Sequence, residues 1–310
     1  MKKVFIDGSA GTTGLRIAER LADRSDIELI KLTEERRKDP EARKDALNRA
    51  DLSFLCLPDD AAKEAASWTE NPDAVLIDTS TAHRTAPGWV YGFPEIVGKA
   101  TVASSHRIAN PGCHASGFVA LIAPLVRAGA LKKDAFLSCT SLTGYSGGGK
   151  KMIAEYESTD RDPLLDAPRT YALGQTHKHL KEMSVQTELL TPPAFLPIVA
   201  PFYSGMEVLV PVSIEDLTVP ASELLGIYKE YYENTLVHVM DDPSENGFLS
   251  ALAFSGRDDM EVAVFGNSER ILLSSRFDNL GKGASGSAIQ NMNLVFGCAE
   301  TTGLVTGGAK

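Results

Sequence analysis

The chain has 310 residues, of which 43% are hydrophobic and 23% are charged. These fractions are typical of a folded globular protein and argue against long disordered stretches. The length suggests one large or two medium domains, of which we favour two. With 41 acidic and 31 basic residues, the formal net charge is −10. This charge argues against nucleic acid or an anionic membrane as the main partner, because both are negatively charged.

The N-terminus and the cysteines indicate the compartment. Residues 1–8 lead directly into a predicted strand, and no window holds the roughly 18 apolar residues that a membrane helix needs. The four cysteines are far apart and show no C-x-x-C spacing, so they do not form a disulfide framework. We expect a cytoplasmic protein without a membrane segment. These cysteines are Cys56, Cys113, Cys139 and Cys298.

The first motif is a glycine-rich turn between a predicted strand at residues 4–6 and a predicted helix. Its spacing, G-x-x-G-x-x-G, is a variant of the dinucleotide fingerprint. In that fingerprint the backbone approaches a pyrophosphate that rests on the helix N-terminus. We therefore predict a nucleotide-binding loop, and its cofactor-binding residues would be Gly8, Ser9, Gly11, Thr12, Thr13 and Gly14.

The residues after the second predicted strand, 27–32, bear on the choice of cofactor. An NAD enzyme usually has an acidic residue here for the ribose 2′-hydroxyl, whereas residues 33–38 read Thr-Glu-Glu-Arg-Arg-Lys. A basic cluster suits a 2′-phosphate, so Arg36 and NADP are favoured. Glu34 or Glu35 would instead serve NAD, and the whole segment could be a solvated helix start.

Strands and helices continue to alternate through the first third of the chain. Residues 52–57 and 74–78 form predicted strands on either side of a predicted helix at 61–68. This order predicts a Rossmann-like, doubly wound parallel sheet, so the fold class is α/β. Functional residues of such sheets lie after the strand carboxyl ends, which nominates Pro58, Ser80 and the segment that reaches Arg84.

Cys113 ends an Asn-Pro-Gly-Cys turn that is followed by an apolar run at residues 118–126. A cysteine at the start of a helix lies beside unpaired N–H groups and the positive end of the helix dipole, and both favour the thiolate. The alternative is a small buried hydrophobe. His114 points about 100° away from Cys113 on a helix, so we interpret it as a structural or local residue.

His177 and His179 alternate in a segment that we expect to be extended, so both would face one site. An H-x-H pair also occurs in metal sites, but no third ligand has suitable spacing, and we expect no metal. Arg84 and Lys150 are candidates for binding a phosphate or carboxylate, or are surface charges. Residues 146–149 offer clustered N–H groups for an anion.

The remaining segments predict a second domain of the α+β class. Residues 207–214 and 261–265 are strand-like, which indicates a largely antiparallel sheet. Residues 285–296 predict a closely packed helix whose buried stripe would contain Ala288, Met292 and Val295.

Seven segments in order carry a family resemblance. The chain resembles the short type of N-acetyl-γ-glutamyl-phosphate reductase, within the wider aspartate-semialdehyde dehydrogenase-like group. The H-x-H and the residues after Asp278, continuing to Asn293, favour this enzyme over its aspartate-semialdehyde relative. The matching segments are residues 8–14, 78–84, 91–95, 110–113, 144–150, 177–179 and 278–284.

The resemblance implies reduction of an acyl phosphate to an aldehyde with NADPH, a step of arginine biosynthesis. Cys113 would form a thioester that accepts hydride, and His179 would be the acid/base. The substrate-binding residues would be Arg84, Asn110, His177, Tyr171, Glu182 and Lys150. Further cofactor contacts would come from Ser146, Gly147 and Asn279.

The family also implies a discontinuous cofactor domain, because its C-terminal helix returns to the first domain. We therefore divide the chain into a dinucleotide-binding domain (1–112 plus 283–310) and a catalytic, substrate and oligomerisation domain (113–282). We expect a homodimer or homotetramer. Two alternatives stay open, an aspartate-semialdehyde dehydrogenase-like enzyme and a non-catalytic NADP-binding regulator. The acyl phosphate would be a small molecule, although a carrier-linked one is a further alternative.

Overall fold

The chain divides into two compact units, which we describe separately. We describe residues 1–307 of a computed structural model. Unit 1 contains Met1–Gly112 and Ala284–Leu304, and unit 2 contains Cys113–Gly283 together with the segment from Val305 onward. Residues 308–310, which the sequence-based division assigns to the first domain, lie outside the described residues.

Unit 1 is built on a six-stranded sheet of order β2-β1-β3-β4-β6-β5, in which all paired strands are parallel. This confirms the predicted parallel sheet. The order reverses between β1 and β3, which makes their carboxyl ends the switch point of the sheet. The strands are β1 Lys2–Asp7, β2 Ile27–Ile30, β3 Leu52–Leu55, β4 Val75–Asp78, β5 Val90–Tyr91 and β6 Arg107–Ala109.

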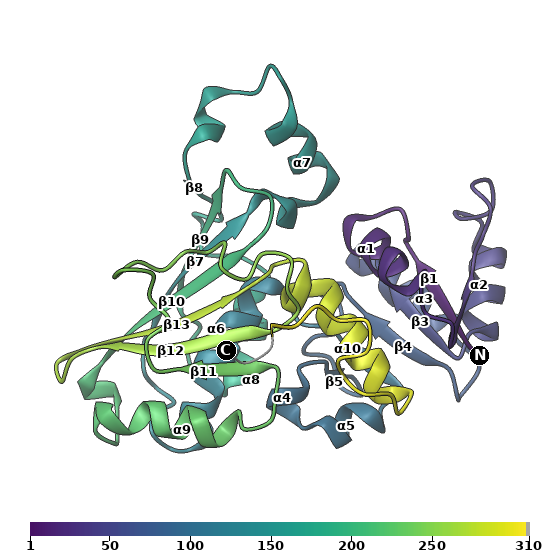
Figure 1. The fold of residues 1–310 in the computed structure, drawn as a ribbon. Helices are drawn as coiled ribbons and strands as arrows, with labels where there is room; N and C mark the ends of the chain where they lie inside the picture. The colour runs from purple at the N-terminus through teal and green to yellow at the C-terminus, as the bar shows by residue number, and fades with distance from the viewer. Residues whose placement is uncertain (308–310) are drawn as a thin grey trace. The chain divides into compact units, whose positions relative to one another are not determined.

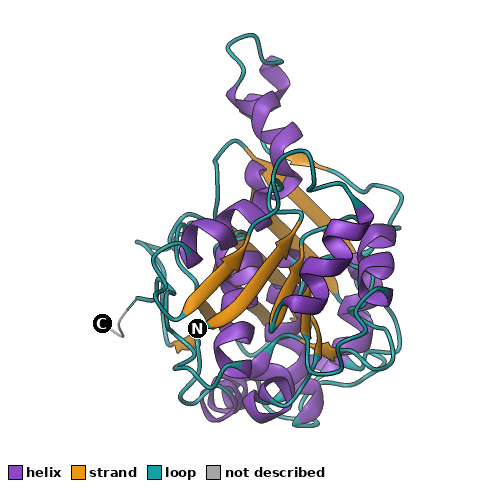
Figure 2. Ribbon diagram, turned by 90° about the vertical axis from the view of Figure 1, so that its right-hand side faces the viewer, coloured by secondary structure: helices purple, strands orange, loops and turns teal. Residues whose placement is uncertain are grey.

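Helices cover both faces of this sheet, as Figure 2 shows. Alternate residues of β1 point to opposite faces, so Val4 packs in one apolar core with Ile17 and Met292, while Phe5 packs in another with Ala46 and Ala62. The second core therefore lies under α2 and α3. The helices of unit 1 are α1 Thr12–Leu21, α2 Pro40–Arg49, α3 Asp59–Ser67, α4 Pro94–Val97, α5 Lys99–Ala103 and α10 Gly286–Val295.

The predicted C-terminal helix is confirmed as α10, which follows a π-helical turn at Gly281–Ser285. Ala288 and Met292 are fully buried as predicted, but Val295 is only half-buried. Residues 286–293 are all buried, so protein covers every side of this part of the helix, and burial is not limited to one apolar stripe. Small residues permit this, because they let neighbouring backbones approach.

The end of the described chain differs from the sequence-based division. Val305 forms two hydrogen bonds with Asp258: the Val305 N–H donates to the side-chain carboxylate at 2.8 Å, and the Asp258 N–H donates to the Val305 carbonyl at 2.7 Å. Gly307 N–H likewise donates to Asp259 at 3.0 Å. Residues 305–307 therefore belong to unit 2, because buried carboxylates of that unit accept their N–H groups.

Unit 2 contains a seven-stranded sheet of order β11-β12-β13-β10-β7-β9-β8. Its pairs are antiparallel except for β11 with β12 and β7 with β9, which confirms a largely antiparallel sheet. The strands are β7 Ser138–Gly144, β8 Arg169–Thr170, β9 Ala194–Ala200, β10 Met206–Ser213, β11 Val237–Met240, β12 Met260–Gly266 and β13 Arg270–Phe277.

One face of this sheet packs against α6, Cys113–Arg127, which begins at the predicted cysteine. Val208 and Val210 alternate with half-exposed neighbours, so the opposite face of β10 stays partly open. In residues 1–307, no helix combines the length and apolarity needed to cross a membrane. The other helices are α7 Gly149–Glu157, α8 His179–Thr187 and α9 Leu224–Tyr231, with 3₁₀ turns at Tyr145–Gly148, Pro163–Asp166, Ile214–Asp216 and Ala221–Glu223.

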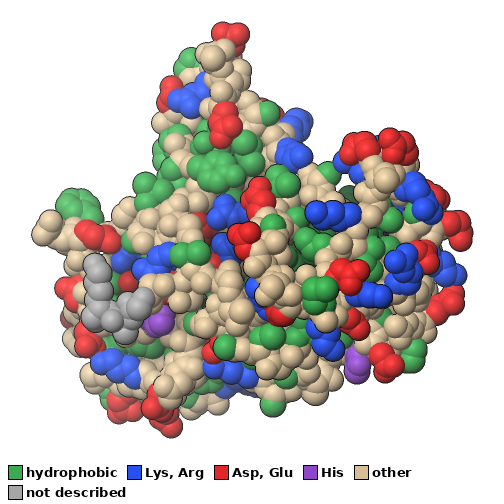
Figure 3. Space-filling view, turned by 45° about the vertical axis from the view of Figure 1, so that its right-hand side comes forward, with side chains coloured by type: hydrophobic (Ala, Val, Ile, Leu, Met, Phe, Trp, Pro, Cys, Tyr) green, Lys and Arg blue, Asp and Glu red, His purple; other side chains and the backbone are tan. Residues whose placement is uncertain are grey.

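A segment that carries α7 projects from the sheet of unit 2 (Figure 1). Tyr145 and Tyr156 stack at a ring separation of 4.7 Å, and the Arg169 guanidinium lies 5.4 Å from the Tyr156 ring centre. Leu165 and Val199 complete this small apolar cluster. Figure 3 shows hydrophobic side chains gathered on the projecting segment. The segment is therefore anchored to the sheet by aromatic packing.

Candidate active site

The candidate residues of unit 1 follow four strands that end in register. Asp7 pairs with Leu55, Leu55 with Asp78, and Asp78 with Ala109. The turns that follow β1, β3, β4 and β6 therefore meet at one edge of the sheet. Pro58, which caps α3, and the glycine loop lie at this edge, as expected for a ligand site at a switch point.

The glycine loop is shaped for close approach of an anion. Gly8 has a φ of +87°, and a Cβ atom there would collide with the Cys56 carbonyl oxygen. The Gly11 N–H donates to the Gly8 carbonyl at 2.9 Å, and Gly11 caps α1 without a side-chain bond. Thr12 Oγ1 is buried and has no hydrogen-bond partner among the described residues. These features fit the pyrophosphate of a dinucleotide.

Basic side chains follow the end of β2. Arg36 is exposed, and its Nε lies 3.9 Å from Asp39. Arg37 pairs with Glu34 at 2.5 Å, which leaves Glu34 engaged on the protein surface. A hydrogen bond with the backbone lowers the pKa of Glu35. The long exposed side chain of Arg36 can reorient toward a ligand at small energetic cost.

Asp78, at the end of β4, organises the turn that contains Ser80. The buried carboxylate accepts from the Ser80 N–H at 2.9 Å and from its hydroxyl at 2.8 Å, and it lies 2.6 Å from His83 Nδ1. The His83 ring stacks on Trp89 at 3.9 Å. Nothing in the local sequence indicated that His83 would order this turn, because its partners become neighbours only through the fold.

Asn110 ties the Asn-Pro-Gly-Cys turn to the rest of unit 1. Its amide donates to the Ala284 carbonyl at 2.9 Å, and its Oδ1 accepts from Asn291 at 3.1 Å. The Arg84 Nε donates to the Asn110 carbonyl at 2.9 Å. Asn110 thus sets the position of the turn, and Arg84 is held beside it by backbone carbonyls.

Cys113 is half-buried and is the first residue of α6, as the sequence predicts. A Cβ atom at Gly283 would lie only 2.9 Å from the Cys113 Cβ, so glycine is needed there to leave space. Two of the other cysteines differ: burial raises the pKa of Cys56 to about 12 and raises that of Cys139 as well. Those two thiols stay protonated at neutral pH, which makes them poor nucleophiles.

His114 lies at the centre of a cluster of rings in unit 2, which we call the imidazole cluster and which also contains Tyr171, His177 and His179. Its Nδ1 is 2.6 Å from Ser141 Oγ, and its Nε2 is 2.7 Å from the Tyr171 hydroxyl. The rings of His177 and His179 lie 6.0 and 5.8 Å from it. Of the two expectations for His114, a structural residue agrees with its burial, whereas a merely local residue was wrong, because β7 and the segment after β8 bring its partners from far along the chain.

The H-x-H pair does not lie on an extended segment, contrary to our expectation. His177 lies in irregular backbone just before a turn at Lys178, and His179 is the first residue of α8. The His179 N–H donates to His177 Nδ1 at 3.1 Å, so His177 satisfies an N–H group at the helix start. The rings still meet at 4.6 Å. Glu182 follows His179 by three residues, almost one turn later, and is buried.

Asn279, Ser146 and Gly147 also come together in unit 2. Asn279 donates to Ser146 Oγ at 3.0 Å and accepts from the Gly205 N–H at 3.0 Å. Lys150 is exposed on α7, and no hydrogen bond or ion pair in the described part of the chain links it to the imidazole cluster. Across residues 1–307, no group of three or more His, Cys, Asp or Glu side chains is arranged to hold a metal ion.

Burial of His114 predicts a pH-dependent stability. Desolvation lowers its pKa to about 3, whereas the unfolded chain protonates this ring near 6.5. Stability is therefore present above pH 6.5 and lost as pH falls toward 3, at about 1.4 kcal/mol per pH unit. Urea unfolding of His114→Gln between pH 6 and 4 should show a smaller loss than the wild type. If the free energy of unfolding fell equally with pH in both proteins, the prediction would be contradicted.

The two units and their candidate residues define an oxidoreductase of the semialdehyde dehydrogenase class. A semialdehyde dehydrogenase NAD-binding domain matches residues 3–104, and a semialdehyde dehydrogenase dimerisation domain matches residues 113–279. Solved structures show the same fold. An aspartate semialdehyde dehydrogenase from Francisella tularensis aligns with a TM-score of 0.72 and 14% identity, covering 96% of this chain and all of that one. The enzyme with NADP from Candida albicans gives 0.67 and 16%, covering 95% of this chain and 99% of that one.

The chain belongs to the N-acetyl-γ-glutamyl-phosphate reductase family. It is 42% identical to N-acetyl-gamma-glutamyl-phosphate reductase 2 of a Nostoc species over 97% of this chain and 99% of that protein. It is also 42% identical to the reductase of Burkholderia lata over 96% of this chain and 97% of that protein. Both matches span nearly the whole of each protein, so the membership includes both units.

Proposed function

We propose that this chain reduces N-acetyl-γ-glutamyl phosphate to N-acetylglutamate 5-semialdehyde and phosphate, with NADPH, through a thioester on Cys113. The observation that carries the proposal is the position of Cys113 as the first residue of α6, next to the imidazole cluster of unit 2. The names of the relatives and the shared semialdehyde dehydrogenase class support the same reaction. The four cysteines form no disulfide among the described residues, which supports a cytoplasmic location.

The cofactor would be held by residues at the carboxyl edge of the sheet in unit 1. The loop residues would bind the pyrophosphate, Arg36 a 2′-phosphate, and the turns with Pro58 and Ser80 the remainder. Ser146, Gly147 and Asn279 of unit 2 would contribute further contacts. When bound, NADPH supplies the hydride. The loop residues in question are Gly8, Ser9, Gly11, Thr12, Thr13 and Gly14.

Cys113 performs the covalent step in this proposal. Its thiolate attacks the acyl carbon, a carbon–sulfur bond forms, and the carbon–oxygen bond to phosphate breaks. The thioester carbon then accepts hydride, and the resulting thiohemiacetal oxygen takes a proton. When the carbon–sulfur bond breaks, that proton returns to the base, the aldehyde leaves and the thiolate is restored.

We assign this proton transfer to His179 rather than His177. His177 Nδ1 accepts the His179 N–H, and an accepting nitrogen carries no proton, so His177 is less suited to cycle through the imidazolium form. His177, Tyr171 and Glu182 would orient the substrate. Arg84, Asn110 and Lys150 would bind its phosphate or carboxylate, with Asn110 acting mainly through the turn that it holds.

A substrate panel tests the proposed function. We expect the protein to form NADPH from N-acetylglutamate semialdehyde, NADP and phosphate, and to form little without phosphate, because phosphate must release the acyl group from the thioester. Aspartate semialdehyde should be a poor substrate. Turnover of aspartate semialdehyde alone would indicate the sister enzyme, and cofactor binding without turnover of either would indicate a regulator.

The choice of cofactor depends on Arg36. Arg36→Glu should raise the KM for NADPH by about 10- to 100-fold and change the KM for NADH little, because it removes a cation near the 2′-phosphate and adds a like charge. Initial rates with both cofactors measure this ratio. The matched control is Arg49→Glu on α2, an exposed arginine paired with Asp45. Equal effects of Arg36→Glu on both cofactors would contradict NADP specificity.

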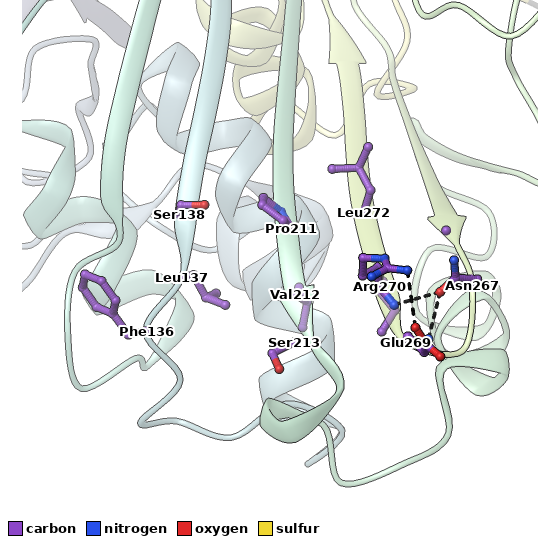
Figure 4. A pocket seen from close by; sticks show the side chains of 12 residues that line it. Phe136, Leu137, Ser138, Pro211, Val212, Ser213, Asn267, Glu269, Arg270 and Leu272 are labelled. Atoms are coloured by element: carbon purple, nitrogen blue, oxygen red, sulfur yellow. Dashed lines mark hydrogen bonds and ion pairs between the residues drawn. The ribbon is translucent and has the colours of Figure 1, made fainter.

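We further propose that the chain forms a homodimer through the open face of the sheet in unit 2, or a homotetramer that contains two such dimers. Pro211 and Leu272 pair on this face and border a cavity of about 670 Å³ (Figure 4). Phe136 at its rim is exposed. The match of residues 113–279 to a dimerisation domain supports association through unit 2. Light scattering should give at least twice the monomer mass, and Leu272→Asp should reduce it.

A further inference from the structure

His114 has no role in the reaction proposed above, although it lies beside the proposed nucleophile. It follows the nucleophile directly, is buried, and bridges Ser141 on β7 to Tyr171, which lies 57 residues further along the chain. The Phe195 ring packs 5.4 Å from it, and burial strongly disfavours the imidazolium form. A neutral imidazole has one donor nitrogen and one acceptor nitrogen, so His114 donates one of its two hydrogen bonds and accepts the other.

Ser141 determines which nitrogen carries the proton. Its side chain is fully buried, and within residues 1–307 its Oγ has no hydrogen-bond partner other than His114 Nδ1. A buried hydroxyl proton without an acceptor costs free energy, so the Ser141 hydroxyl donates to Nδ1. The imidazole proton is therefore on Nε2, and it donates to the Tyr171 oxygen. The Tyr171 proton is then left for another acceptor.

Tyr171 is placed to use that proton near the nucleophile. Its N–H donates to the Pro197 carbonyl at 3.0 Å, which fixes its backbone beside β9, while the side chain is only half-buried. Burial, and after it the charge of Cys113, raise the pKa of Tyr171, so the phenol stays protonated at neutral pH and lies within electrostatic range of the thiol. A fixed neutral donor of this kind can stabilise a developing oxyanion.

We propose that His114 is a positioning residue that directs the Tyr171 hydroxyl proton toward the carbonyl oxygen of the acyl group bound to Cys113. Ser141 sets the tautomer of the ring, and Nε2 holds the phenol oxygen. Tyr171 then acts as a hydrogen-bond donor when negative charge develops on the substrate oxygen. This inference rests on the proposed function, because it concerns the same acyl intermediate.

Two conservative variants of His114 separate positioning from packing. The glutamine amide of His114→Gln reaches the location of Nε2 and can still donate to Tyr171, whereas the shorter side chain of His114→Asn reaches only the location of Nδ1, beside Ser141. We expect Tyr171→Phe and His114→Asn each to lower kcat by about 100-fold with little change in KM. His114→Gln should retain kcat within about threefold.

A double-mutant cycle tests whether His114 acts through Tyr171. The double variant His114→Asn/Tyr171→Phe should be no slower than Tyr171→Phe alone, because the hydroxyl that His114 positions is already absent. Thermal unfolding of every variant serves as the control for folding. In the wild type, ¹⁵N NMR of labelled histidine should show a neutral His114 ring with its proton on Nε2 from pH 5 to 8.

The proposal is overturned if the losses of the two single variants multiply in the double variant, if His114→Asn and His114→Gln are equally active as folded proteins, or if the proton is on Nδ1. A loss confined to KM would also contradict it, since ground-state binding would then explain Tyr171. If the wild type does not turn over N-acetylglutamate semialdehyde, the proposed function fails and this inference fails with it. If the wild type is active and Tyr171→Phe and His114→Asn leave kcat unchanged, the inference alone is overturned.

Discussion

Replacing Cys113 with alanine is expected to lower kcat for phosphate-dependent oxidation of N-acetylglutamate semialdehyde by about 10⁴-fold or more, because no thioester can form. Binding of NADP should remain close to that of the wild type, since the candidate cofactor residues of unit 1 are untouched. Initial rates measure the first effect. Quenching of the protein's fluorescence during titration with NADP, or calorimetry, measures the second.

Cys298→Ala is the matched control for this variant. Cys298 is also half-buried, but it follows α10 in unit 1 and lies 3.9 Å from the Arg24 guanidinium. Its replacement should leave the rate within about twofold, because no step of the proposed reaction uses it. A Cys113→Ala enzyme with more than a tenth of the wild-type rate would rule out the covalent route.

The second large effect is expected for Arg276→Met, which should lower the free energy of unfolding by about 3–5 kcal/mol. Arg276 is almost fully buried on β13, and its guanidinium donates to Glu261 at 2.9 Å and to Glu245 at 2.6 Å. Burial raises the pKa of Glu207 to about 6 and that of Glu261, although Arg276 opposes both shifts. Without the guanidinium, Glu261 would remain buried without its cation. Urea unfolding measures the change.

Arg270→Met on the same strand provides the control. The Arg270 side chain is 81% exposed and pairs with Glu269 at 3.3 Å, so its loss should cost less than about 1 kcal/mol. The double variant Arg276→Met/Glu261→Gln should recover part of the stability, because it removes the charge that Arg276 compensates. A single Arg276→Met variant as stable as Arg270→Met would contradict the role of the buried pair.

The fold of unit 1 was predictable from local signals. The short apolar runs at residues 4–6 and 74–78 and the alternating helices are properties of neighbouring residues, and they identified the parallel sheet. The predicted strands at residues 27–32 and 52–57 extend two residues beyond the observed ends of β2 and β3. The cause is that apolar side chains such as Leu32 and Leu57 continue past the last paired residue. Strand ends depend on pairing with another strand, which a local pattern does not contain.

The chemistry of the candidate site was only partly predictable. Cys113 stood out because a helix start is visible in the sequence, and α6 begins there. The extended geometry that we predicted for the H-x-H pair was wrong, because an alternating pattern does not reveal that His177 accepts the first N–H of a helix. The role of His114 was missed, since its partners Ser141 and Tyr171 lie 27 and 57 residues away.

The sequence by itself therefore determined the class of fold and pointed to a candidate nucleotide loop and a candidate nucleophile, because each depends on residues within one turn, strand or helix. Only the tertiary structure decided which polar groups are buried and what they bond. Burial sets the protonation of His114 and the cost of removing Arg276, and it arises from segments that are distant in the chain. The long-range contacts that bury a charged or polar side chain are formed by the whole fold, so no local pattern specifies them.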